Sequence, residues 1–283
     1  MSKIMKKISA FIEISRPANV IIGIFSVFVA IYITKITPQP FVWISVAITA
    51  ACFTAGANAI NDVYDVEIDK INRPDRPLPA GKLTQKEAVR FSLLCFFFGF
   101  IPNVWLSWWN QIIAVIAIIF LILYTPYLKK RLILGNLLVS FITGLAFVYG
   151  AAAAGKMSLG IYPAIIAFFI HLTREIIKDL EDREGDKKAG ATTLAVMVSV
   201  PVVHKLIALL FVLDIGVIAG GYFWGFFNQN YLFITSILII PFYLFFMIKY
   251  LIQHDYIPEM YSSSSLMLKI SMLIGIVAFY LGI

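Results

Sequence analysis

The stretch FVWISVAITAACFTAGANAINDVYDVEID, residues 41–69, passes directly from an apolar run into three aspartates. About 20 apolar residues are enough to cross the hydrocarbon core of a bilayer. The aspartates Asp62, Asp65 and Asp69 follow at steps of three and four, which predicts that their carboxylates share one face of a helix. The stretch therefore predicts a membrane-spanning helix that carries an acidic cluster at its end.

A second stretch, GIYPAIIAFFIHLTREIIKDLEDREGD at residues 160–186, repeats this pattern with Asp179, Asp182 and Asp186. Four predicted helices separate the two triplets, and an even number brings both to the same side of the membrane. Twelve of the sixteen acidic residues fall in residues 62–87 and 175–186. Carboxylates at the edge of a bilayer are costly unless cations compensate them. We interpret the paired triplets as functional, although a single one would fit an ordinary solvated helix end.

The composition excludes a soluble protein. Of the 283 residues, 60% are hydrophobic and 14% are charged, and the mean hydropathy is +0.88. Soluble domains average roughly 45–50% apolar and about 25% charged residues. The predicted fold class is all-α, a multi-pass membrane bundle of about nine helices. These are expected near residues 17–35, 41–60, 88–107, 111–127, 133–153, 160–177, 201–224, 231–250 and 266–282.

The basic residues predict the topology. With the N-terminus in the cytoplasm, 21 of the 23 Lys and Arg residues fall on that side, and only Lys35 and Lys156 fall opposite. The positive-inside rule therefore favours a cell-membrane protein whose N-terminus and triplets are cytoplasmic and whose C-terminus is outside. The net charge of +7 describes this rim and not a nucleic-acid partner. We expect one transmembrane domain over 1–283, with an interfacial amphipathic helix at 1–15 and cytoplasmic active-site loops at 61–87 and 178–200.

The triplets have the chemistry of a magnesium site. Mg²⁺ binds one or two carboxylates and completes its octahedron with water and substrate phosphate. Two facing triplets predict two Mg²⁺ ions around a diphosphate, with all six aspartates as metal ligands and catalytic residues. Asn58 and Asn61 lie one turn before Asp62 and Asp65, and their amides offer further polar contacts without added charge.

Other polar residues on the same side are candidates for substrate binding. Arginine binds phosphate bidentately, and prolines stiffen the segment that carries Arg73 and Arg76, although positive-inside charge explains any single basic residue equally well. An isolated carboxylate at mid-span, Asp214, is expected to face the interior of the bundle. The substrate-binding candidates are Asn19, Asn58, Asn61, Arg73, Arg76, Lys82, Tyr124, Lys129 and Lys178. Arg174, Glu175 and Lys178 are expected to form ion pairs that orient the second triplet or bind substrate.

At the two triplets the sequence resembles the UbiA superfamily of intramembrane prenyltransferases. Asn61-Asp62-x-x-Asp65-x-x-x-Asp69 is similar to the first aspartate-rich motif of that family, and Asp179-x-x-Asp182-x-x-x-Asp186 to the second. The resemblance covers the whole chain and implies a prenyl diphosphate donor, Mg²⁺ and a bundle embedded in membrane lipids.

Within the family, the Asn72-Arg-Pro-Asp-Arg-Pro-Leu-Pro-Ala-Gly81 loop and the segment 174–194 are most similar to archaeal members that act on a lipid-like, phosphate-bearing acceptor. That resemblance implies transfer of a geranylgeranyl group to geranylgeranylglyceryl phosphate, a step of ether-lipid synthesis. Relatives that use a hydroxybenzoate, a naphthoate or haem share much of the loop and remain an alternative. A CDP-alcohol phosphotransferase fits poorly because no Asp-Gly pair occurs, and a transporter fits poorly because the acids lie on one side.

Overall fold

The computed structural model describes residues 3–123, 131–188 and 190–283. Helices dominate the chain, and a parallel pairing of two two-residue strands is the one sheet in the described part. The elements are α1 (Lys3–Ser15), α2 (Pro17–Ile33), α3 (Pro40–Tyr64), α4 (Val66–Asn72), α5 (Gln85–Phe100), η1 (Ile101–Trp105), α6 (Trp108–Leu123), β1 (Arg131–Leu132), α7 (Leu134–Ala153), η3 (Met157–Gly160), α8 (Ile161–Glu181), α9 (Arg183–Lys188), β2 (Thr192–Thr193), α10 (Leu194–Met197), α11 (Val200–Phe223), α12 (Gln229–Leu238), α13 (Ile240–Ile252) and α14 (Pro258–Leu281).

The predicted class, an all-α membrane bundle, is confirmed. Among the described residues, seven helical segments are long and apolar enough to cross a membrane, and the bent pair α1–α2 adds an eighth. The shorter apolar helix α6 occupies the place of the remaining window, and α12 and α13 together occupy one window. Large apolar side chains such as Phe97, Phe233 and Ile44 are more than half exposed on the outside of the bundle. In a membrane protein these side chains face lipid.

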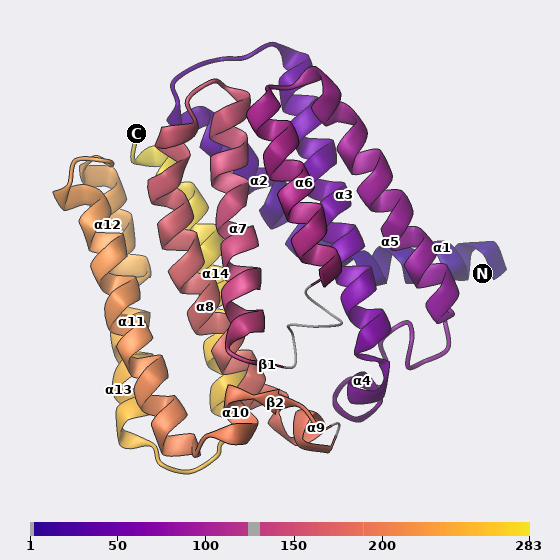
Figure 1. Cartoon of the computed structure of the whole chain (residues 1–283). Coiled ribbons are helices and arrows are strands. Elements are labelled where there is room, and N and C mark those ends of the chain that lie inside the picture. Colours follow the sequence, from indigo (N-terminus) through magenta and orange to yellow (C-terminus); the bar gives the residue numbers. More distant parts are fainter. Residues whose placement is uncertain (1–2, 124–130, 189) are drawn as a thin grey trace.

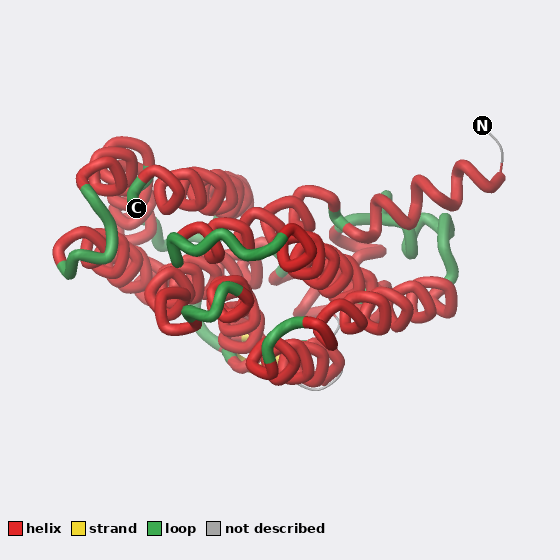
Figure 2. The backbone as a smooth tube through the Cα atoms, turned by 90° about the horizontal axis from the view of Figure 1, so that it is seen from above, coloured by secondary structure: helices red, strands yellow, loops and turns green. Residues whose placement is uncertain are grey.

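Small residues let the central helices approach closely. A Cβ on Gly150 of α7 would lie 2.4 Å from the Val27 carbonyl oxygen of α2, and one on Gly144 would lie 2.8 Å from the Ala164 carbonyl oxygen of α8. Contacts between backbones of this kind are typical of membrane helices, where packing replaces the hydrophobic effect. As a result α7 packs against both α2 and α8, and α14 packs against the same two helices. Figure 2 looks down on the bundle from above, with the N-terminal helix projecting from one side.

Helix α1 bends by 52° from α2 and projects from one side of the bundle (Figure 1). Ile4, Ile8 and Ile12 are 72%, 54% and 55% exposed, whereas Ala10 and Ile14 are buried against neighbouring elements. The exposed isoleucines form an apolar face, as the sequence predicts for a helix at a membrane surface. Arg16 occupies the bend with a left-handed φ of 55°.

Within the stretches 61–87 and 178–200, the triplets lie on the ends of α3 and α8 and on the short helices α4 and α9, whereas residues 73–84 are not helical. Each triplet also straddles a helix break at its middle aspartate, since α3 ends before Asp65 and α8 ends before Asp182, both with φ near −92° and ψ of 1°. The i→i−4 hydrogen bonds nevertheless continue, from Asp69 N to Asp65 O at 2.7 Å and from Asp186 N to Asp182 O at 3.0 Å. The triplets therefore bend with the chain instead of lying along one straight helix.

Candidate active site

The two acidic segments, more than a hundred residues apart in sequence, lie side by side at one end of the bundle. Helices α4 and α9 are in contact there (Figure 1). The Arg73 guanidinium, just after α4, donates to Asp182 at 2.9 Å and lies 4.0 Å from Asp69, so one cation joins both triplets. A Cβ on Gly185 would lie 2.4 Å from the side-chain Nδ2 of Asn72, so a larger residue here would have to displace the Asn72 side chain at the end of α4.

Arginines neutralise the first triplet. Asp62 is 2% exposed and forms ion pairs with Arg16 and with Arg76, the latter at 3.3 Å. Arg76 also donates to Asp69 at 2.6 Å. Burial raises the pKa of the Asp69 carboxyl above its ordinary value, and the adjacent Arg76 limits that rise. Burial opposes the charge on Arg76, but Asp62 and Asp69 outweigh it and raise the pKa of Arg76, which keeps the guanidinium charged.

Uncharged side chains donate hydrogen bonds to carboxylates of both triplets. The Asn136 amide of α7 donates to Asp179 at 2.9 Å, and the Thr193 hydroxyl of β2 donates to Asp186 at 3.3 Å. On the first segment the Asn61 amide donates to Asp65 at 2.9 Å. Each of these donors fixes a carboxylate without adding charge.

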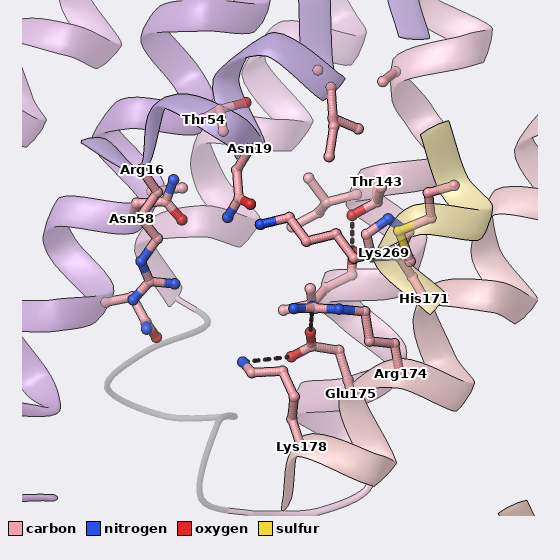
Figure 3. Close-up of a pocket in the computed structure, with 18 of the residues that line it drawn as sticks. Arg16, Asn19, Thr54, Asn58, Thr143, His171, Arg174, Glu175, Lys178 and Lys269 are labelled. Carbon is pink, nitrogen blue, oxygen red and sulfur yellow. Dashed lines mark hydrogen bonds and ion pairs between the residues drawn. The ribbon is translucent and has the colours of Figure 1, made fainter. Parts of the chain in front are cut away.

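Above the triplets lies a cavity of about 760 Å³, enclosed mainly by α2, α3, α6, α7, α8 and α14 (Figure 3). Its end near the triplets is lined by carboxylates and cations. Further from the triplets its walls become apolar, with Phe53, Ile113, Leu145, Phe147 and Ile276 among the lining residues. An amphiphile with a highly charged head and a hydrocarbon tail matches this change of polarity.

The comparisons with known proteins agree with this arrangement. The model of the UbiA prenyltransferase family matches residues 22–268. The chain belongs to the UbiA prenyltransferase family. It is therefore a multi-pass membrane protein and a prenyltransferase.

Two UbiA relatives illustrate the similarity in sequence. The chain is 35% identical to a digeranylgeranylglyceryl phosphate synthase of Methanosphaera stadtmanae, over 96% of this chain and 98% of the relative. It is 36% identical to a protein of the same name from Sulfolobus acidocaldarius, over 97% of this chain and 98% of the relative.

Solved UbiA structures have the same fold. One described as a digeranylgeranylglyceryl phosphate synthase in membranes is 30% identical, with a TM-score of 0.76 over 98% of both chains. A UbiA homologue from Archaeoglobus fulgidus bound to DMAPP and Mg²⁺ is 18% identical, with a TM-score of 0.71 over 95% of this chain and 98% of that one. The second likeness shows the fold alone, and the family thus includes members that bind Mg²⁺ with a prenyl diphosphate.

Most residues predicted for the site line this cavity. They are Asn19, Asn58, Asn61, Asp65, Asp69, Arg73, Arg76, Lys178, Asp179, Asp182 and Asp186. Two predicted residues are placed elsewhere. Asp62 lies behind the lining in its double ion pair, and the Lys82 amine is bound 2.9 Å from Glu13 at the surface. Tyr124 and Lys129 lie outside the described residues.

The structure also brings polar residues to the cavity that sequence reasoning did not select. Asn136 and Lys269 are the main examples, and each lies within a predicted membrane span. Their position in an apolar run is the signal that could have identified them, because polar groups inside a membrane are usually functional. Asp214 is fully buried and accepts a hydrogen bond from Thr173 at 2.7 Å, so it faces the interior as expected but lies outside the cavity lining.

The carboxylate oxygens of the two triplets are suitable ligands for Mg²⁺, which prefers oxygen and often shares its coordination shell with phosphate. Within residues 3–123, 131–188 and 190–283, no three acidic, histidine or cysteine side chains converge closely enough to hold a metal ion by themselves. Guanidinium groups lie against the carboxylates instead, in the ion pairs Arg73–Asp182 and Arg76–Asp69. A site of this kind offers one or two carboxylates to each ion and leaves the remaining positions to a phosphate ligand.

Proposed function

We propose that this protein transfers a geranylgeranyl group from geranylgeranyl diphosphate to the free hydroxyl of geranylgeranylglyceryl phosphate. The product is digeranylgeranylglyceryl phosphate, an intermediate of archaeal ether lipids. The observation that carries the proposal is a cavity with two converging acidic segments at one end and apolar walls beyond. Relatives named digeranylgeranylglyceryl phosphate synthase, at 31–40% identity, support this choice of substrates.

The diphosphate of the donor would lie between the triplets, with two Mg²⁺ ions held by Asp65 and Asp69 on one side and by Asp179, Asp182 and Asp186 on the other. Bound there, Mg²⁺ would neutralise the negative charge that develops on the leaving diphosphate. We assign Asp62 to a positioning role, because both of its ion-pair partners line the cavity while it does not.

The chain's own cations complete the donor site. Arg73 and Arg76 are already held at the triplets by ion pairs and can turn to the incoming phosphate oxygens. Asn19 and Asn58 line the cavity wall near Arg16 (Figure 3), and their side-chain amides provide hydrogen-bond donors beside that arginine. The apolar wall takes the prenyl tail and excludes water from C1, so the acceptor hydroxyl is the nucleophile available to attack it.

We further propose the setting of the reaction. The chain forms one prenyltransferase domain in the cell membrane, with its N-terminus and the triplets in the cytoplasm and its C-terminus outside. The distribution of Lys and Arg supports this orientation. Helix α1 would lie on the inner leaflet, where its exposed isoleucines contact lipid.

A panel of acceptors tests the proposal. Purified protein is incubated with radiolabelled geranylgeranyl diphosphate, Mg²⁺ and either geranylgeranylglyceryl phosphate, a hydroxybenzoate, a naphthoate or haem. We expect label in the glyceryl ether and in none of the aromatic acceptors. Label in an aromatic product, with none in the ether, would reject the assigned acceptor and retain the prenyltransferase chemistry.

A further inference from the structure

A second group of cations lies deeper in the cavity than the aspartate triplets. Glu175 precedes Asp179 by four residues on α8, which places it about 6 Å further along the helix axis. Arg174 and Lys178 flank it, and Lys269 extends from α14 into the same part of the cavity, on the side of Asn19 (Figure 3).

This group carries more positive charge than its own carboxylate can neutralise. Glu175 accepts from Arg174 at 3.0 Å and lies 3.8 Å from Lys178, so two cations share one carboxylate. Lys269 forms no ion pair or hydrogen bond with any described residue, and the cations Arg174 and Arg16 lie near enough to repel its charge. With the aspartates of the second triplet counted as part of the metal site, three cations and one carboxylate leave an excess of about two positive charges in a low-dielectric wall, where such an excess favours a bound anion.

Two buried side-chain nitrogens near this group also lack partners. The Nε of Arg174 and the Nδ1 of His171 are buried with no hydrogen-bond partner among the described residues. Ser265 is 7% exposed, lines the cavity and lies one turn before Lys269 on the same face of α14. Buried polar groups without partners are uncommon in folded proteins and indicate a missing ligand or water.

These features fit a phosphate monoester better than a second metal-bound diphosphate. A phosphate monoester carries about −1.5 to −2 charge at neutral pH, with three acceptor oxygens, which matches the excess charge and the fork-shaped donors of Arg174. The group has one carboxylate, already shared by two cations, and therefore offers little to a divalent ion.

The position of the group also suits the acceptor. In geranylgeranylglyceryl phosphate the free hydroxyl and the phosphate belong to the same three-carbon glycerol unit, so they lie within a few bonds of each other. The hydroxyl must reach C1 of the donor, which lies next to the diphosphate on its apolar side. A phosphate site one helical turn deeper than the second triplet brings the hydroxyl to that level.

We propose that Arg174, Lys178, Lys269 and Ser265 form a metal-independent site for the phosphate of a glyceryl phosphate acceptor. This inference rests on the proposed function and specifies how the acceptor is recognised. The substrate-binding candidates Arg76 and Lys82 are not part of this site, since Arg76 is held by the first triplet and Lys82 lies at the surface. The site would select phosphorylated over neutral glyceryl ethers.

Steady-state kinetics with two acceptors test the site. Lys269→Gln is compared with the wild type and with Lys249→Gln, a control lysine on α13 outside the cavity lining. We expect Lys269→Gln to raise KM for geranylgeranylglyceryl phosphate roughly 10- to 100-fold, the loss of one charge-assisted hydrogen bond. Transfer to geranylgeranylglycerol, which lacks the phosphate, and KM for the donor should change less than about twofold, and the control should match the wild type. Equal losses with both acceptors, or a raised KM for the donor instead, would overturn the proposal.

A binding measurement without turnover separates this inference from the proposed function. Binding of geranylgeranylglyceryl phosphate to the whole protein is measured in EDTA, without donor, and inorganic phosphate is added as a competitor. We expect binding that Lys269→Gln weakens about tenfold and Lys269→Arg retains. If the wild type binds in this way but forms no digeranylgeranyl product, the proposed function fails and the phosphate site stands. If transfer is normal and binding requires Mg²⁺ or ignores Lys269, the phosphate site fails alone.

Discussion

Replacing Asp62 by asparagine separates a positioning residue from a metal ligand. The carboxylate is 2% exposed and holds Arg16 and Arg76, both of which line the cavity. Breaking a fully buried ion pair costs about 3–5 kcal/mol, and a hydrogen bond to a charged group contributes about 1.5–3 kcal/mol. Because the two arginine side chains are 25% and 22% exposed, water replaces part of the loss, and we expect about 2–3 kcal/mol.

For a chain of 283 residues that loss corresponds to a fall of roughly 3–5 °C in Tm, measured by thermal unfolding in detergent. The released arginines should raise KM for the prenyl diphosphate about tenfold, while the Mg²⁺ concentration for half-maximal activity stays within about twofold of the wild-type value. Asp69→Asn serves as the comparison, because Asp69 lines the cavity and its loss should raise that Mg²⁺ concentration. An unchanged Tm for Asp62→Asn, together with a Mg²⁺ requirement raised as far as in Asp69→Asn, would show that Asp62 is a ligand and refute the reasoning.

Three further substitutions probe the site. Asn136→Leu removes the donor to Asp179 and should raise the required Mg²⁺ concentration or KM for the donor roughly 10- to 100-fold; unchanged kinetics would contradict a supporting role. Gly185→Ala places a methyl group against α4 and should lower both kcat and Tm, whereas Gly216→Ala, with open space around its Cβ position, should leave both unchanged; equal behaviour of the two variants would argue against close packing of α4 on α9. Lys82→Met should leave KM for both substrates within about twofold of the wild-type values, because the exposed Lys82–Glu13 ion pair contributes at most about 1 kcal/mol. A large rise in KM for the acceptor would show that Lys82 binds the acceptor.

The bundle itself was predictable from the sequence because each membrane-spanning helix is encoded by its own run of residues. A run of about 20 apolar residues defines a span whatever its neighbours are, and all nine predicted windows coincide with helical segments within the described residues. The convergence of the triplets also followed from local information, since an even number of intervening spans returns the chain to the same side of the membrane.

The details of the site depend on tertiary packing, which spacing alone does not reveal. Arg76 and Lys82 occur six residues apart in one loop, yet the first turns inward to Asp69 and the second outward to Glu13. The break of α3 at Asp65 has no proline or glycine to announce it. Which carboxylate faces the cavity is decided by the bend of the helix and by the arginines that pack behind it.

Polar residues inside apolar runs were the signal that sequence reasoning used least. Asn136 and Lys269 each stand almost alone among apolar neighbours, so they contribute to no motif. The fold brings them to the cavity from α7 and α14, on either side of α8. Their selection required knowing which helices face each other.

If the paired triplets hold a metal-bound diphosphate, the affinity for geranylgeranyl diphosphate must depend on Mg²⁺, so binding is compared with and without the ion. Binding is measured for the wild type and for a variant that combines Asp65→Asn with Asp182→Asn, one neutral replacement in each triplet. We expect Mg²⁺ to tighten binding to the wild type strongly and to have almost no effect on the variant. Equal binding to the wild type in Mg²⁺ and in EDTA, or a full Mg²⁺ effect in the variant, would contradict it.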